Sequence, residues 1–189
     1  MSETTDTRTR ILDAAQEMIQ RHGLNAMSFK DLSEAVGIRK PSVHHHFATK
    51  ADMVNALLDR FQSEFRQAVD AIVGARVTGK TKLRRYCDLF LATLEHGKND
   101  KSCLCGMLVA EIYSLDEEGV RRVRAFFQDN VDVIQQILEL GRNDKSLNGK
   151  GSADIVLATL EGGLFTSRCE GGPKRFAEMI NSLLRVLSS

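Results

Sequence analysis

Residues 27–47 read MSFKDLSEAVGIRKPSVHHHF, and this stretch decides the fold of the first part of the chain. Its pattern predicts two short helices joined by a tight turn at Gly37. The second helix carries cations, a serine and three consecutive histidines at positions that a core would not favour. This layout is typical of a helix-turn-helix, whose second helix enters the major groove of DNA. Apolar side chains are spaced to hold the two helices at a fixed angle: Leu32, Ala35, Val36, Ile38, Val43 and Phe47.

The composition predicts an all-α globular fold. The 189 residues are 42% hydrophobic and 27% charged and include only two prolines. No apolar run approaches the ~20 residues that span a bilayer, and the polar N-terminus lacks the apolar segment of a secretory signal. We therefore expect a cytoplasmic protein with reduced cysteines and no membrane partner.

The net charge of +1 argues against binding of nucleic acid over the whole surface. Positive charge would have to be local instead, and candidate cations for such a surface lie within the first 50 residues. They are Arg8, Arg10, Lys30, Arg39, Lys40 and Lys50.

Helix signals divide the chain into a three-helix unit, residues 1–49, and a helical bundle, residues 50–189, with about nine helices in total. The first helix is expected over Thr7–His22. Ser28 with Asp31, and Thr49 with Asp52, have the spacing of capping boxes that open the second and fourth helices. The third helix begins near Lys40. The later helices are expected over residues 81–96, 103–114, 117–141, 153–170 and 173–187.

Residues 36–50, VGIRKPSVHHHFATK, resemble the signature of TetR/AcrR-type transcriptional repressors. The resemblance covers about residues 7–55. It implies a homodimer of all-helical subunits that binds a near-palindromic operator and releases it when a small-molecule inducer enters the second domain. Residues 50–189 would then form the ligand-binding and dimerisation domain. Neither a cofactor nor an enzymatic activity is expected, since no catalytic motif stands out.

The resemblance also implies which residues contact DNA. Arg39, Lys40 and Ser42 fall where family members touch base edges, and His44 and His45 fall near phosphates. The remaining candidates are Lys50, which matches a lysine that meets the DNA backbone, and Lys30, which adds local positive charge.

Three departures from the family pattern make the operator sequence specific to this chain. Arg39 replaces the usual Ser or Thr cap, Pro41 replaces a glycine, and His44 replaces a tyrosine. The missing cap costs about 1 kcal/mol of helix stability. A contact between Arg39 and a guanine or a phosphate could offset this loss of stability in the DNA complex.

The three histidines do not predict a metal site. Neighbouring side chains on a helix point ~100° apart, so these three rings cannot converge on one ion. No metal is expected elsewhere either.

Cys103 has two interpretations. It precedes a predicted helix, with Lys98 and Lys101 nearby, and both features favour the reactive thiolate. The segment CLCGMLVAE from Cys103 also resembles one in a TetR subgroup that includes sensors of electrophiles and oxidants. Alternatively, Cys103 and Cys105 are small buried hydrophobic residues. Oxidation or alkylation of Cys103 is thus an alternative trigger to ligand binding.

Aromatic, soft and polar residues in the predicted bundle are candidates for a ligand pocket, because small-molecule sites combine an apolar lining with a few polar groups. They are Phe61, Phe65, Tyr86, Phe90, Cys103, Met107, Glu111, Tyr113, Phe127 and Phe165.

The last two helices are candidates for a dimer interface. Small residues recur every four positions in the first of them, which would let a partner helix approach closely. The candidate interface residues are Ala158, Gly162, Thr166, Ile180, Leu183 and Leu187. The opposing hypothesis for the whole chain is an all-α small-molecule-binding or interaction protein that does not bind DNA.

Overall fold

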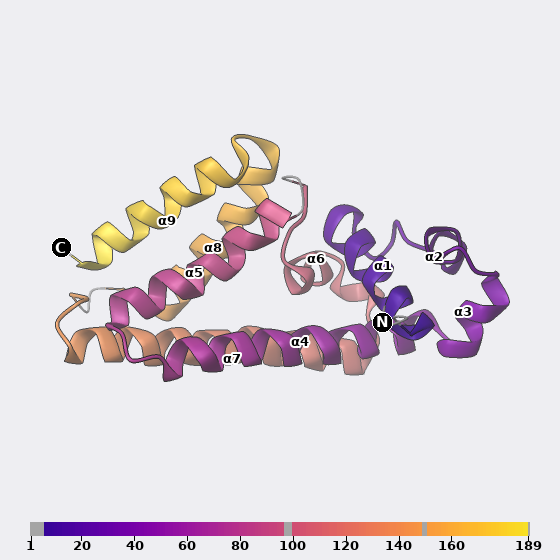
Figure 1. Cartoon of the computed structure of the whole chain (residues 1–189), viewed down its shortest axis with the longest axis horizontal. Coiled ribbons are helices and arrows are strands. Elements are labelled where there is room, and N and C mark those ends of the chain that lie inside the picture. The colour runs from indigo at the N-terminus through magenta and orange to yellow at the C-terminus, as the bar shows by residue number, and fades with distance from the viewer. Residues whose placement is uncertain (1–5, 97–99, 149–150, 189) are drawn as a thin grey trace, which may run out of the picture. The chain divides into compact units, whose positions relative to one another are not determined.

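The computed structural model describes residues 6–96, 100–148 and 151–188, and the regular secondary structure within them is entirely helical (Figure 1). This confirms the all-α prediction. A short 3₁₀ helix, Ile112–Ser114, lies between α6 and α7. The α-helices are α1 (Thr7–His22), α2 (Phe29–Val36), α3 (Lys40–His46), α4 (Lys50–Gly74), α5 (Gly79–His96), α6 (Leu104–Ala110), α7 (Glu117–Asn143), α8 (Ala153–Cys169) and α9 (Gly172–Ser188).

The chain forms two compact units. The N-terminal unit comprises residues 1–63 and 104–124, and the C-terminal unit comprises residues 64–103 and 125–189. Both α4 and α7 contribute to each unit. The helix-turn-helix therefore shares its compact unit with the first half of α4, α6 and the start of α7. The functional boundary near residue 49 stays a prediction.

In the N-terminal unit, α1 packs against α2 and α6, and α2 packs against α3 (Figure 1). One stripe of α1 supplies much of this core, because Ile11, Ala15 and Ile19 recur at helical spacing and are fully buried. An ion pair of 2.7 Å between Arg60 and Asp13 links α4 to α1.

In the C-terminal unit, α5, α8 and α9 pack against one another (Figure 1). Phe176, Ile180 and Leu184 lie four residues apart on α9, and all three are buried. Leu160 and Leu164 of α8 are likewise completely buried. The amphipathic pattern of these helices therefore places their apolar faces in one shared core.

A buried lysine closes the turn between α4 and α5. The Lys82 side chain is 6% exposed, and its ammonium donates hydrogen bonds to the carbonyl oxygens of Ile72 and Val73, at 3.4 and 2.5 Å, and of Ala75. These carbonyls belong to the end of α4 and the residues after it, where the helix leaves acceptors without intrahelical donors.

Across the described ranges, no helix is both long enough and apolar enough to cross a membrane.

Candidate nucleic-acid interface

Capping residues close in sequence set the start and the end of α2. The Ser28 hydroxyl accepts the Asp31 N–H at 3.3 Å, and the Asp31 carboxylate accepts the Ser28 N–H at 2.7 Å, so the predicted capping box opens α2. The Ser28 hydroxyl also donates to the Asp31 carboxylate at 2.7 Å, and this bond, together with the one from the Ser28 N–H, lowers the pKa of Asp31. Gly37 ends α2 in the left-handed conformation, with φ of 71°, and the Ile38 N–H returns to the Ser33 carbonyl at 3.0 Å.

The helix α3 is held by one buried face. Val43 is fully buried and Phe47, just after the helix, is 3% exposed. The guanidinium of Arg8 lies 5.2 Å from the centre of the Phe47 ring. Arg10 donates a 2.5 Å hydrogen bond to the carbonyl of Val36 at the end of α2. Residues on α1 thus fix both helices of the motif.

The remaining surface of α3 and its N-cap is open and polar. Five of the predicted DNA-contacting residues are exposed there, namely Arg39, Lys40, Ser42, His44 and His45. Arg39 is the N-cap of α3 and makes no side-chain capping bond, as the sequence predicted. The face therefore offers cations and hydrogen-bond donors to a negatively charged partner.

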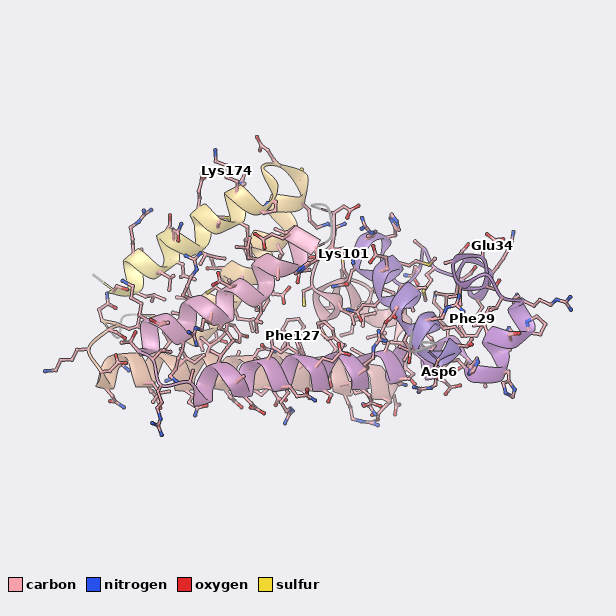
Figure 2. The ribbon with its side chains drawn as sticks, viewed as in Figure 1. Asp6, Phe29, Glu34, Lys101, Phe127 and Lys174 are labelled. Atoms are coloured by element: carbon pink, nitrogen blue, oxygen red, sulfur yellow. The ribbon has the colours of Figure 1, made fainter. Side chains whose placement is uncertain are left out.

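Phe29, in the first turn of α2, contacts His44 of α3. The ring of His44 packs edge-on against Phe29, with the ring centres 4.9 Å apart. Phe29 is buried and Glu34 is exposed, and both are labelled on α2 in Figure 2. The predicted contact residue Lys30 is exposed but lies 3.7 Å from the Glu34 carboxylate, which offsets part of its charge.

Lys50 is placed differently from the other predicted contacts. Its ammonium donates hydrogen bonds to the backbone carbonyls of Leu24 and Met27, at 2.6 and 2.7 Å. Burial lowers the pKa of Lys50, and the charges of Glu111 and Asp31 oppose that shift. Sequence alone could not show this, because the carbonyls lie 26 and 23 residues away.

Three of the residues predicted to line a ligand pocket pack together in the C-terminal unit, namely Phe65, Tyr86 and Phe90. Phe65 packs edge-on against Tyr86 and Phe90, with ring centres 6.2 Å apart in both pairs. The sequence prediction missed Phe126, whose ring lies 5.3 Å from Phe65 and is almost fully buried. Its neighbour Phe127, which the prediction included, is half-buried on α7 (Figure 2).

This cluster contains polar groups as well as rings. The Tyr86 hydroxyl donates a hydrogen bond to the amide oxygen of Asn130, and the Asn130 amide nitrogen donates to the carbonyl of Phe126 at 2.6 Å. Burial raises the pKa of Tyr86 far above its ordinary value. The hydroxyl therefore stays neutral and serves as a hydrogen-bond donor.

Two predicted pocket residues do not lie in a pocket in this structure. Tyr113 is 102% exposed and Phe165 is 40% exposed. Tyr113 belongs to the 3₁₀ helix, whose tight turn directs a side chain that a continuous α-helix would have placed elsewhere.

Three further pocket candidates belong to the N-terminal unit. They are Phe61, Met107 and Glu111. The Glu111 carboxylate accepts backbone N–H groups of the loop between α1 and α2, which gives it a structural function there.

Cys103 and Cys105 are both buried, as the alternative interpretation of these cysteines expected, and all four cysteines carry thiols. The sequence did not predict the carboxyl of Glu161 on α8 beside Cys103. Burial raises the pKa of Glu161 to about 7, and the thiol of Cys103 partly opposes this shift. Lys98, one of the two lysines invoked for thiolate stabilisation, lies outside the described residues.

The candidate dimer residues fall into two groups. Ala158, Gly162 and Thr166 are exposed on α8. Ile180 and Leu187 are 1% and 4% exposed, so they belong to the core of this chain and are not available to a partner. Leu183 is half-buried. The prediction was wrong for Ile180 and Leu187 because α9 uses its apolar stripe to pack within the chain.

An open groove of about 490 Å³ lies along α5 and α9. None of the predicted pocket residues lines it. It is lined by Lys80, Thr81, Arg84, Asn181, Leu184 and Arg185. Arg84 is held by Asp88 and Asn181, at 2.8 and 2.6 Å.

No group of three or more His, Cys, Asp or Glu side chains in the described part of the chain is arranged to hold a metal ion.

Comparison with known proteins identifies the family that the N-terminal part of the chain resembles. The sequence model of bacterial regulatory proteins of the tetR family matches residues 11–57, which include α2, α3 and most of α1. A TetR-family transcriptional regulator from Agrobacterium tumefaciens is similar in structure over 97% of this chain and 98% of its own, with a TM-score of 0.90 and 29% sequence identity. The helix-turn-helix part of the chain is thus similar to that of TetR-family regulators.

Curated relatives match this chain over shorter stretches. The transcriptional repressor KstR2 of Mycobacterium tuberculosis is 31% identical over 97 residues, which are 49% of this chain and 45% of KstR2. The transcriptional regulator UidR of Escherichia coli is 31% identical over 75 residues, which are 38% of each protein. The match thus spans less than half the length of these curated relatives. By their names, both relatives are transcriptional regulators.

Proposed function

We propose that this chain is a sequence-specific DNA-binding repressor that releases its operator when a small molecule binds. The observation that carries the proposal is the α3 helix. One face is anchored by Val43 and Phe47, and the other presents Arg39, Lys40 and His45 to solvent. This is the arrangement needed for a helix that enters the major groove and meets base edges and phosphates.

The exposed side of α8 supports a homodimer. Ile155 is 61% exposed and Phe165 is 40% exposed, and they share a stripe with Ala158 and Gly162. A Cβ added at Gly162 would meet no atom of this chain within 4 Å, so the space next to the glycine is available to a partner helix. In this proposal two copies pair through α8 and the adjoining part of α9. Pairing would set two α3 helices on successive major grooves, ~34 Å apart.

The proposed binding region for the inducer is the aromatic cluster of Phe65, Tyr86, Phe90 and Phe126. Cys103 and Phe127 belong to the same compact unit. An apolar lining with a few polar groups is the usual design of a small-molecule site, and Asn130 and Glu161 supply such groups here. Release would follow if the inducer favours a dimer whose α3 helices are wrongly spaced for the operator.

The test is recovery and sequencing of genomic DNA fragments that bind the purified protein at ~150 mM salt, where exposed charges are partly screened. The expected result is enrichment of a short palindrome. The matched control is a Lys40→Ala, His45→Ala double variant, because both residues are exposed and neither is part of the core. Loss of the Lys40 cation should lower the slope of log affinity against log salt by about 1.

The alternative class is an all-α ligand-binding or interaction protein without DNA binding, and the net charge of +1 is the observation that favours it. Equal recovery of DNA by the wild type and the double variant would support this alternative.

A thiol trigger at Cys103 has less support than ligand binding. Reactive cysteines are at least partly exposed, whereas the Cys103 thiol is buried and lies beside the Glu161 carboxyl. The Cys103→Ser variant separates the two triggers. If a quinone releases DNA from the wild type and equally from the variant, the thiol trigger is contradicted.

A further inference from the structure

The loop over residues 23–28, between α1 and α2, is gripped by two oppositely charged side chains. We call this loop the α1–α2 loop. Lys50 binds two of its carbonyl oxygens, and Glu111 binds two of its N–H groups. Neither side chain belongs to the helix-turn-helix, since Lys50 is the first residue of α4 and Glu111 follows α6.

The Lys50 contact satisfies backbone acceptors. Its ammonium is 2.6 Å from the Leu24 carbonyl oxygen and 2.7 Å from that of Met27. These bonds are charge-assisted, and such bonds are about twice as strong as neutral ones. They use two of the three ammonium hydrogens.

The Glu111 contact satisfies backbone donors of the same loop. One carboxylate oxygen accepts the Leu24 N–H at 2.5 Å and the Asn25 N–H at 3.1 Å. The carboxylate lies so close to Gly23 that a Cβ added there would be 2.8 Å from the other carboxylate oxygen. The loop therefore has little room to move relative to Glu111.

We propose that Glu111 and Lys50 are positioning residues for DNA binding, which act by fixing the α1–α2 loop and through it the start of α2. The α2 helix packs on α3, so the loop sets where the DNA-contacting face lies in the N-terminal unit. This inference rests on the proposed function. It differs from the expectation that Lys50 binds a phosphate, because the structure commits the ammonium to backbone carbonyls.

The first experiment separates positioning from phosphate contact at Lys50. Affinity for the selected DNA fragment is measured across a salt series for the wild type, Lys50→Met and the matched variant Lys40→Met. Lys40→Met should reduce the slope of log affinity against log salt by about 1, as expected for a lost DNA charge contact. Lys50→Met should weaken binding about tenfold at every salt concentration, with the slope unchanged. A slope reduced as much as in Lys40→Met would overturn the assignment of Lys50.

The second experiment tests Glu111 by amide hydrogen exchange and DNA affinity. In Glu111→Ala, the Leu24 and Asn25 amides should exchange about tenfold faster, because each loses its acceptor, and DNA affinity should fall with an unchanged salt slope. The control is Asp13→Asn, which removes a carboxylate that links α1 to α4 without touching the loop. Both readouts should stay at the wild-type level in this control.

The outcomes are distinguishable from failure of the proposed function. Wild type and Asp13→Asn without DNA affinity would contradict the repressor proposal, while the exchange rates would still decide whether Glu111 holds the loop. If the wild type and Glu111→Ala bind DNA with the same affinity, only the proposed role of Glu111 is overturned. If Glu111→Ala does not fold, Glu111→Gln replaces it. This variant keeps a weaker, neutral acceptor, because charge-assisted hydrogen bonds are about twice as strong as neutral ones. Exchange should still become faster and DNA affinity should still fall, by smaller factors than in Glu111→Ala, and unchanged values of both would contradict the proposal.

Discussion

Glu161 carries a carboxyl group in the interior of the C-terminal unit. Both of its oxygens are buried, and within the described ranges neither reaches a nitrogen or oxygen partner. Burial accordingly raises its pKa from 4.5 to about 7. A proton held this strongly by the folded chain is released at lower pH by the unfolded chain, so the free energy of unfolding depends on pH.

The sign of that dependence follows from the raised pKa. The stabilising contribution is fully present below pH 4.5 and is lost as the pH rises through about 7. The loss should be about 3 kcal/mol, since one unit of pKa difference corresponds to ~1.4 kcal/mol. Denaturant titrations of wild type and Glu161→Gln at several pH values measure it. The difference between the two proteins should change across this window, and a constant difference would contradict the raised pKa.

The burial and the partners of some single residues could not be predicted from the sequence. Phe126 and Phe127 are adjacent, and the ~100° between neighbouring helix positions decides that the first is buried and the second half-buried. The two residues have the same side chain, so composition could not distinguish them. Likewise, the partners of Lys50 become visible only when the α1–α2 loop and the start of α4 are brought together.

At the scale of elements, α2 and α3 begin in different ways. Ser28 and Asp31 form a reciprocal cap at α2, whereas Arg39 makes no side-chain capping bond at α3. Arg39→Ser should therefore raise the free energy of unfolding by about 1 kcal/mol, because a serine can accept an N–H of the first turn. Thermal or denaturant unfolding measures the gain.

The same substitution should weaken DNA binding if Arg39 contacts a base or a phosphate. Ser28→Ala is the converse control, because it removes an existing cap and should cost about 1 kcal/mol. If the stability of Arg39→Ser equals that of the wild type, the N–H groups at the start of α3 already have hydrogen-bond acceptors in solution.

Several helix boundaries were predicted well, whereas the start of α5 was not. The first helix, Thr7–His22, was confirmed, and so was the capping box at Thr49 and Asp52. In contrast, α5 begins two residues before the predicted start at residue 81. The prediction missed a local cap, in which the Thr78 hydroxyl accepts the Thr81 N–H at 3.3 Å. It could not have included the second partner, because the Gly79 N–H donates to the Asp144 carboxylate at 2.7 Å, 65 residues away.

At the scale of the whole molecule, the exposed stripe of α8 makes the assembly testable. Gly162 is exposed and has open space where a side chain would project, so Gly162→Arg should fold as a single chain. In the proposed dimer the same arginine would block close approach of the partner helix. Light scattering coupled to size-exclusion chromatography should show a shift from dimer to monomer.

The matched control for the dimer test is Gly74→Arg. An added Cβ at Gly74 also meets no atom of the chain within 4 Å, but Gly74 ends α4 and lies outside the stripe. A wild type that is monomeric, or a Gly162→Arg variant that stays dimeric, would move the interface away from α8.

Lys82 offers a chemical reporter for the hairpin of α4 and α5. Its amine is buried under three carbonyl oxygens, whereas Lys80, two residues earlier, is exposed. An acylating reagent added to the folded protein should modify Lys80 promptly and reach Lys82 only after the turn has opened. Mass spectrometry of the acylated peptides would then time that opening, with each molecule of protein carrying a slow-reacting and a fast-reacting lysine side by side.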